Sequence, residues 1–278
     1  MMYRKVKKIT VQGLTMRLRR NALRHKNGYA HYTSYAALAA MLSSERIHLS
    51  SRSRLNDLGE MLNDRTFVAS FVYGTEENLA MWGLYGVPRS AAVRIKFPCA
   101  SIREWLDGLR PLREVCAYAY DRKMGEYELL KTRIKRLVFS DVAYSSCRNK
   151  RLLHVEDHFV LSDGDVNDER LQGVIKAYPW RYEQEVRLLL EFVSAPVDSR
   201  GRKVDTIAID FRDPIEELRE RQVGLMFGPW ANGRNREPGQ HIVAGHRLRF
   251  EVSSLRGLVR YRKVWFILVC CLDEDVSS

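Results

Sequence analysis

Apolar and polar positions along the chain form short stretches of period two and of helical period, which predict short strands mixed with short helices. Strands are expected at residues 29–33, 47–50, 67–71, 91–97, 180–192, 206–211, 246–252 and 260–272. Helices are expected from Ser34, a suitable N-cap, to about Ser43, at residues 78–85 before Gly86, over most of 101–138 and at 215–221. These elements follow no regular strand–helix–strand rhythm, which favours an α+β fold.

The first 28 residues differ from the rest of the chain in charge. Nine of them are Lys or Arg and none is acidic. A solvated charged arm and an arm that contacts phosphates both fit such a block. We therefore divide the chain into a basic N-terminal arm, residues 1–28, and a single domain, residues 29–278. Within the domain, the polar segments 52–62, 145–170 and 228–239 are expected to be mainly loops.

Composition narrows the class of protein. Of the 278 residues, 45% are hydrophobic, which is enough for a core, and the net charge of +12 favours an anionic partner, with nucleic acid as the first choice. The five cysteines form no Cys-x-x-Cys pair, and no secretory signal precedes the domain, so a cytoplasmic location is expected. The longest apolar run, residues 264–272, is too short to cross a bilayer, and no membrane association is expected.

Several familiar sites are missing from the sequence. It contains no glycine-rich dinucleotide fingerprint, no Walker A loop and no Gly-x-Ser-x-Gly elbow. Residues 163–174 begin like a calcium loop but have Asp168 where glycine belongs and Val174 where the last glutamate belongs. No metal site is expected.

The stretch from Trp180 to Arg187 carries the most unusual chemistry. If it is part of a strand, Glu183, Glu185 and Arg187 share one face because side chains alternate. Charged groups on a strand that enters a core are costly unless they are paired or used in function. One interpretation is a structural ion network. The other is a catalytic site, since enzymes that break glycosidic bonds use paired carboxylates.

Three stretches together resemble the bacterial family DUF2971. They are Tyr29-Ala30-His31-Tyr32-Thr33-Ser34, then Ser70-Phe71 with residues 78–85, then residues 180–187. Leu55-Asn56-Asp57 is similar to the "FND" element of that family, and Gly228-Pro229 also fits. The resemblance covers residues 29–235.

The same layout resembles a divergent ADP-ribosyltransferase, which implies a split, mixed or antiparallel β-sheet core with flanking helices. The resemblance also implies that NAD is the ADP-ribose donor. His31 would bond the adenosine-side ribose, Thr33 would fix the nicotinamide amide through its backbone, and Tyr85 would stack on the nicotinamide ring. Glu185 would be the late catalytic glutamate, and Glu183 would orient the acceptor.

The middle aromatic residue of this pattern is open to alternatives. Tyr73, Tyr85 and Tyr118 all fit the place, and Trp82 is a less favoured substitute for Tyr85. Ordinary core packing also accounts for Trp82 and Tyr85 at helical spacing, and His31 also fits a core histidine.

The chemistry of these residues suits the implied reaction. Cleavage of the nicotinamide–ribose bond develops positive charge on the ribose, and an ionised Glu185 on the 2′-hydroxyl would stabilise it. Glu183 could deprotonate the attacking group. Arg187 could hold Glu185 ionised through a charge-assisted bond.

The sequence therefore predicts an NAD-dependent ADP-ribosyltransferase that modifies nucleic acid. RNA is favoured over DNA because no major-groove motif is present, and a basic helix around residues 131–136 is expected to help guide it. Modification of nucleic acid would be toxic, which suggests a bacterial toxin or anti-phage effector restrained by an antitoxin protein. The alternatives are a non-catalytic nucleic-acid-binding protein on a degenerate transferase fold, a protein acceptor, and NAD hydrolysis without an acceptor.

Overall fold

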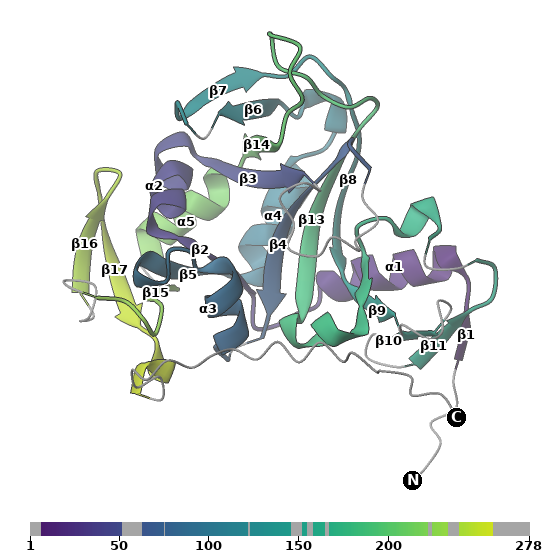
Figure 1. Cartoon of the computed structure of the whole chain (residues 1–278), viewed down its shortest axis with the longest axis horizontal. Helices are drawn as coiled ribbons and strands as arrows, with labels where there is room; N and C mark the ends of the chain where they lie inside the picture. The colour runs from purple at the N-terminus through teal and green to yellow at the C-terminus, as the bar shows by residue number, and fades with distance from the viewer. Residues whose placement is uncertain are drawn as a thin grey trace, which may run out of the picture.

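The computed structural model describes residues 7–51, 63–74, 76–121, 123–145, 152–154, 158–164, 167–221, 224–232 and 239–257. Its main feature is a 12-stranded sheet of mixed strand orientation with helices packed against it (Figure 1), which confirms the α+β class. Ten of the strands follow in the order β16 (Gly239–Val243), β17 (His246–Val252), β15 (Leu225–Phe227), β5 (Ala92–Phe97), β2 (Tyr29–Ser34), β4 (Thr66–Tyr73), β3 (Arg46–Ser51), β14 (Thr206–Asp210), β6 (Ala117–Asp121) and β7 (Glu126–Leu129).

The sheet branches at β4. One edge of β4 pairs with β13 (Glu185–Phe192), which in turn pairs with β8 (Ile134–Asp141). On its other edge, β4 pairs with β3 through Phe67 and Val68, and with β2 through Val72 and Tyr73. Residues 69–71 therefore have no ladder partner on that edge. The strands β2 and β3 separate there and leave an opening in the sheet.

The two faces of the sheet carry different helices. The larger core packs the sheet against α2 (Tyr35–Ser44), α4 (Cys99–Gly108) and α5 (Arg212–Arg221). A smaller cluster packs α1 (Val11–Ala22) against β4, β8 and β13, and Figure 1 shows α1 lying beside β8. Among the described residues, no helix is long and apolar enough to cross a membrane.

The remaining elements are short. A second, five-stranded sheet has the order β1 (Lys7–Ile9), β11 (His158–Leu161), β10 (Leu152–His154), β9 (Ala143–Ser145) and β12 (Ile175–Ala177). One further α-helix is α3 (Leu79–Tyr85). In the part of the chain that the structure describes, the 3-10 helices are η2 (Arg89–Ala91), η3 (Leu112–Glu114), η4 (Glu169–Leu171), η5 (Tyr178–Glu183) and η7 (Ser254–Gly257).

The described part of the predicted N-terminal arm, from residue 7 on, is not a free arm. Thr10 caps α1 by accepting a hydrogen bond from the backbone N–H of Gly13. Val11, Leu14 and Leu18 of this helix are buried against the sheet. Their spacing of three and four residues marks an amphipathic helix, so the segment is part of the folded unit despite its charge.

The predicted helix over most of residues 101–138 is wrong beyond Gly108. After α4 the chain forms β6, β7 and β8. The basic segment at residues 131–136 is therefore irregular backbone followed by the start of β8 rather than a helix. The alternation Ala117-Tyr118-Ala119-Tyr120 has the period of a strand, and pairing of β8 with β13 outweighs the helical spacing of the leucines around it.

Most other predicted elements are present. Strands occur at the positions expected for 29–33, 47–50, 67–71, 91–97, 206–211 and 246–252, and helices at those expected for 34–43, 78–85 and 215–221. The segment 145–170 contains the short strands β10 and β11 as well as loop. The predicted loop 52–62, with the FND-like element, and the predicted strand 260–272 lie outside the described residues.

Candidate functional site

A cavity of about 650 Å³ lies at the opening of the sheet. Side chains of β2, β3, β4 and β13 line it, together with residues of α2 and α3. Its volume falls in the usual range for small-molecule and cofactor sites. Four of the five predicted site residues line this cavity, namely His31, Thr33, Tyr85 and Glu185.

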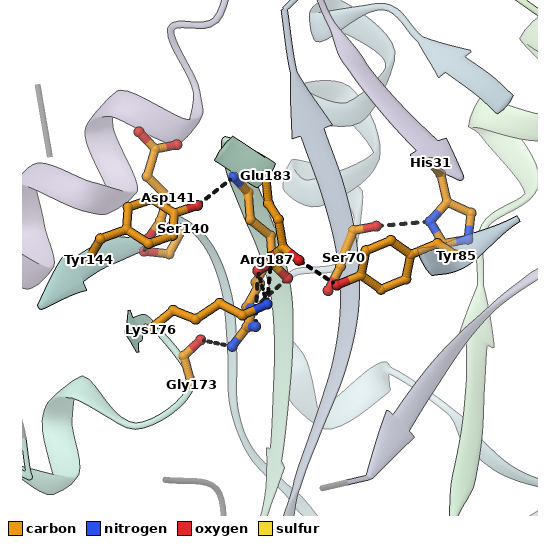
Figure 2. A network of polar contacts seen from close by, with 11 residues as sticks. His31, Ser70, Tyr85, Ser140, Asp141, Tyr144, Gly173, Lys176, Glu183 and Arg187 are labelled. Carbon is orange, nitrogen blue, oxygen red and sulfur yellow. Dashed lines mark hydrogen bonds and ion pairs between the residues drawn. The ribbon is translucent and has the colours of Figure 1, made fainter. Parts of the chain in front are cut away.

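His31 and Thr33 reach the cavity because they are two residues apart on β2 and share one face of the strand. The Nδ1 atom of His31 lies 2.9 Å from the backbone oxygen of Ser70, at the unpaired part of β4 (Figure 2). A carbonyl oxygen only accepts, so Nδ1 carries the proton of this bond. Burial lowers the pKa of His31, which favours the neutral ring. Nε2 of His31 is then a hydrogen-bond acceptor.

Tyr85 is held at the cavity by the ends of α3. Asn78 caps the helix by accepting from the N–H groups of Ala80 and Met81, and its own amide donates to the backbone oxygen of Tyr182 at 2.7 Å. At the other end, the Tyr85 hydroxyl donates to Oε1 of Glu183 at 3.0 Å. The helix is therefore tied to η5 at both ends.

The chain around Glu183 differs from the predicted strand. Residues 178–183 form the 3-10 helix η5, and Gln184 has a left-handed backbone with φ of 47°. The strand β13 begins only at Glu185. Glu185 and Arg187 share a strand face as predicted, but Glu183 does not belong to that strand. It reaches the same place because η5 folds back towards β12.

Two carboxylates and two cations meet there in a buried network (Figure 2). Nζ of Lys176 lies 2.5 Å from Oε2 of Glu183 and 3.3 Å from Oε2 of Glu185. Arg187 binds Glu185 with two nitrogens, Nε at 2.7 Å and Nη2 at 3.0 Å. All four side chains are at least 98% buried. Because the charges balance, the network avoids an uncompensated buried charge.

The network gives its two carboxyl groups opposite protonation behaviour. Burial and the nearby Glu185 charge raise the pKa of Glu183 to about 7. Burial also acts to raise the pKa of Glu185, but Arg187 and Lys176 outweigh it and hold that pKa well below its usual range. Two carboxyl groups separated in this way can take separate roles, one ionised and one able to exchange a proton near neutral pH.

Backbone and hydroxyl contacts position the network. Arg187 also donates from Nη1 to the backbone oxygen of Gly173 at 3.0 Å. The Tyr144 hydroxyl accepts from the N–H of Glu185 at 3.0 Å. The hydroxyl of Ser70, opposite Arg187 in the β4–β13 ladder, contributes a hydrogen bond that lowers the pKa of Glu185.

The structure separates the predicted aromatic alternatives. Of Tyr73, Tyr85 and Tyr118, Tyr85 lines the cavity. Tyr73 instead stacks on His25 at 3.9 Å, and the guanidinium of Arg46 covers Tyr118 at 4.0 Å. Trp82 is fully buried, in a core cluster with Tyr32, and its indole N–H donates to Glu77.

Lys176, Ser70 and Tyr144 are parts of this site that sequence reasoning did not assign. A lone lysine between Ile175 and Ala177 gives no signal except its own charge in an apolar segment.

Among the described residues, no group of three or more His, Cys, Asp or Glu side chains could hold a metal ion. Comparison of the chain with protein-family models, with curated proteins and with solved structures finds no match.

Proposed function

We propose that this protein is an NAD-dependent ADP-ribosyltransferase with the split sheet of that fold class. One observation carries the proposal. His31, Tyr85 and Glu185, which come from β2, α3 and β13, line one cavity at the point where β2 and β3 separate. The motif resemblance assigns these same three residues to the donor site.

The chain supplies groups for donor binding. Nε2 of His31 would accept a hydrogen bond from a ribose hydroxyl, because Nδ1 is committed to the Ser70 carbonyl. Glu185, kept ionised by Arg187 and Lys176, would stabilise the positive charge that develops when the bond from ribose to nicotinamide breaks. Nicotinamide leaves with the bonding electron pair, and the acceptor atom forms the new bond to the same ribose carbon.

Glu183 would take the proton of the acceptor through Tyr85. Glu183 itself is fully buried and does not line the cavity, but Tyr85 lines it, and the Tyr85 hydroxyl donates to Oε1 of Glu183. The acceptor would pass its proton to the Tyr85 oxygen as the Tyr85 proton moves to Glu183. This path requires ionised Glu183.

A second candidate function is nucleic-acid binding without catalysis, and one observation favours it. Arg187, Lys176 and Ser70 together supply four hydrogen bonds to Glu185. A carboxylate has about four acceptor positions. A ribose hydroxyl would therefore have to replace the Ser70 hydroxyl, whereas a purely structural network needs no such exchange.

The direct test is incubation of the purified protein with NAD labelled in the adenylate half. RNA, DNA and protein are offered separately as acceptors, and both label transfer and nicotinamide release are measured. Transfer to nucleic acid supports the proposal, and transfer to protein would change the acceptor. Nicotinamide release alone would indicate NAD hydrolysis, and salt-dependent binding of nucleic acid without turnover would favour the second candidate.

Nucleic acid remains the proposed acceptor because the chain carries a net charge of +12. RNA stays ahead of DNA because the sequence contains no recognisable major-groove motif. From the reaction class we further propose a toxin or anti-phage role in the cytoplasm, restrained by an antitoxin protein. The test of that role is whether a protein encoded next to this chain, when co-expressed with it, inhibits label transfer.

Replacing His31 with asparagine is expected to weaken NAD binding. The asparagine amide can still donate to the Ser70 carbonyl, but no acceptor remains at the position of Nε2. Loss of one hydrogen bond corresponds to an increase of about tenfold in KM for NAD, with a smaller change in kcat. His246→Asn, on β17 at the far end of the sheet, is the matched control. An unchanged KM in His31→Asn would remove His31 from the donor site.

The rate of transfer is expected to rise with pH through about 7 and then level, because Glu183 is the base and only its ionised form accepts a proton. In Glu183→Gln this rising limb should disappear, and the remaining rate should be low at every pH. The measurement is kcat against pH from 5.5 to 9 for both proteins. A Glu183→Gln profile that keeps the same rising limb would assign the titration to another group.

A further inference from the structure

Four aromatic side chains and one arginine cover one face of the sheet beside the cavity. We call this group the aromatic platform, and its members are Arg46, His48, Tyr118, Tyr120 and Tyr127. They belong to β3, β6 and β7, and in Figure 1 these strands with β14 form the upper end of the sheet. His48 and Tyr118 both lie opposite Ala208 of β14, so their side chains point to the same face.

The rings of the platform are already ordered. His48 stacks on Tyr120 with centroids 4.3 Å apart and planes 7° apart, and Tyr120 stacks on Tyr127 at 4.8 Å and 24°. The guanidinium carbon of Arg46 lies 4.0 Å from the ring centre of Tyr118 and 4.7 Å from that of Tyr127. Nε2 of His48 lies 2.8 Å from the Tyr127 hydroxyl.

Core packing does not account for these rings. The residues that alternate with them, including Ile47, Leu49 and Ala119, point to the opposite face and are buried in the main core. Arg46, His48 and the three tyrosines are only half-buried. Rigid, half-exposed rings next to a guanidinium are the features by which proteins stack nucleic-acid bases.

The platform is continuous with the cavity. His48 and Tyr120 line the cavity as well, whereas Arg46, Tyr118 and Tyr127 lie outside its lining. From β3 to β7 the face spans three strand intervals, which is roughly 14 Å. A surface of that width is wider than one base, and it reaches the cavity through His48 and Tyr120.

We infer that the aromatic platform binds the bases of single-stranded nucleic acid and delivers the acceptor nucleotide to the cavity. The inference rests on the proposed function and deepens it, since it names single strands as the form of nucleic acid that reaches the same site and the surface that binds them. Single strands fit because their bases are free to stack, while bases in a duplex are already stacked on one another. The net charge of +12 complements the phosphate backbone.

The test is binding of a fluorescent single-stranded oligonucleotide, a 12-mer of uridine, measured by anisotropy at several salt concentrations. The variant is Tyr118→Leu with Tyr127→Leu, which keeps apolar bulk on a strand but removes two rings. The matched control is Trp230→Leu, which removes a half-buried ring covered by Arg89 at 5.1 Å on another part of the molecule. Thermal unfolding of each variant checks that it is folded.

The platform variant is expected to bind the oligonucleotide about tenfold more weakly per ring removed, with the same salt dependence and an unchanged KM for NAD, while Trp230→Leu binds as the unmodified protein does. Equal binding by the platform variant, or an equal loss in Trp230→Leu, would overturn the inference. A higher KM for NAD with unchanged oligonucleotide binding would assign the platform to the donor's adenine instead. If the unmodified protein shows no transferase activity but the platform variant still loses oligonucleotide binding, the inference about the platform stands. Only the proposed enzymatic activity is then rejected.

Discussion

The variant Glu185→Gln is expected to transfer ADP-ribose about a thousandfold more slowly than the unmodified protein, while it still binds NAD. Glutamine keeps the shape of the side chain and can still contact Arg187, but it removes the negative charge that faces the developing cation. Loss of one preorganised group that stabilises transition-state charge costs about 10²–10³-fold in kcat. The measurement is single-turnover label transfer, with NAD affinity determined separately by calorimetry.

The same strand provides the control for this variant. Glu191 on β13 is also buried and lies within 4 Å of three cations, Arg65, Lys135 and Arg136, yet it does not line the cavity. Glu191→Gln therefore removes a buried, cation-bound carboxylate without touching the proposed site, and it should transfer ADP-ribose at the normal rate. Transfer by Glu185→Gln at the rate of Glu191→Gln would mean that the network around Glu185 is structural.

Local sequence signals predicted the donor side of the candidate site well. The alternation around His31 and Thr33 identified β2, and Ser34 was recognised as a helix cap, which accepts a backbone hydrogen bond as expected. Asn78 was expected to begin a helix, and it lies directly before α3 as its cap. These features depend on residues adjacent in sequence. Gly86 also ends α3 as predicted, and an added Cβ there would lie only 2.5 Å from the Cβ of Ala92.

The carboxylate side of the site was predicted less well, because long-range contacts decide it. Period-two alternation placed Glu183 on the strand of Glu185, but the left-handed residue Gln184 interrupts the strand. Lys176 brings the two carboxylates together from β12, and nothing in its neighbouring residues indicates that partnership. The opening between β2 and β3 likewise depends on where each strand pairs with β4, which no single stretch of sequence encodes.

Replacing Arg187 with methionine is expected to destabilise the protein by about 3–5 kcal/mol at pH 7. The variant leaves Glu183 and Glu185 buried with Lys176 as their remaining cation. Arg187 also donates to the backbone oxygen of Gly173, which would lose that partner. The measurement is the free energy of unfolding from urea titrations. Arg136→Met is the control, because Glu191 keeps Lys135 and Arg65, and it should cost less than about 1 kcal/mol.

Two further results distinguish electrostatics from lost packing in Arg187→Met. The folded protein holds the pKa of Glu185 at about 2, below the ordinary value of 4.5 that the unfolded chain has, so this stabilisation is complete above pH 4.5 and is lost as the pH falls towards 2. The difference between Arg187→Met and the unmodified protein should therefore shrink between pH 4.5 and pH 3. Adding Glu185→Gln to Arg187→Met should restore much of the stability at pH 7, because Lys176 and Glu183 then form a balanced pair. A cost that is independent of pH and unchanged in the double variant would show that Arg187 acts through packing, and the argument that it keeps Glu185 ionised would fail.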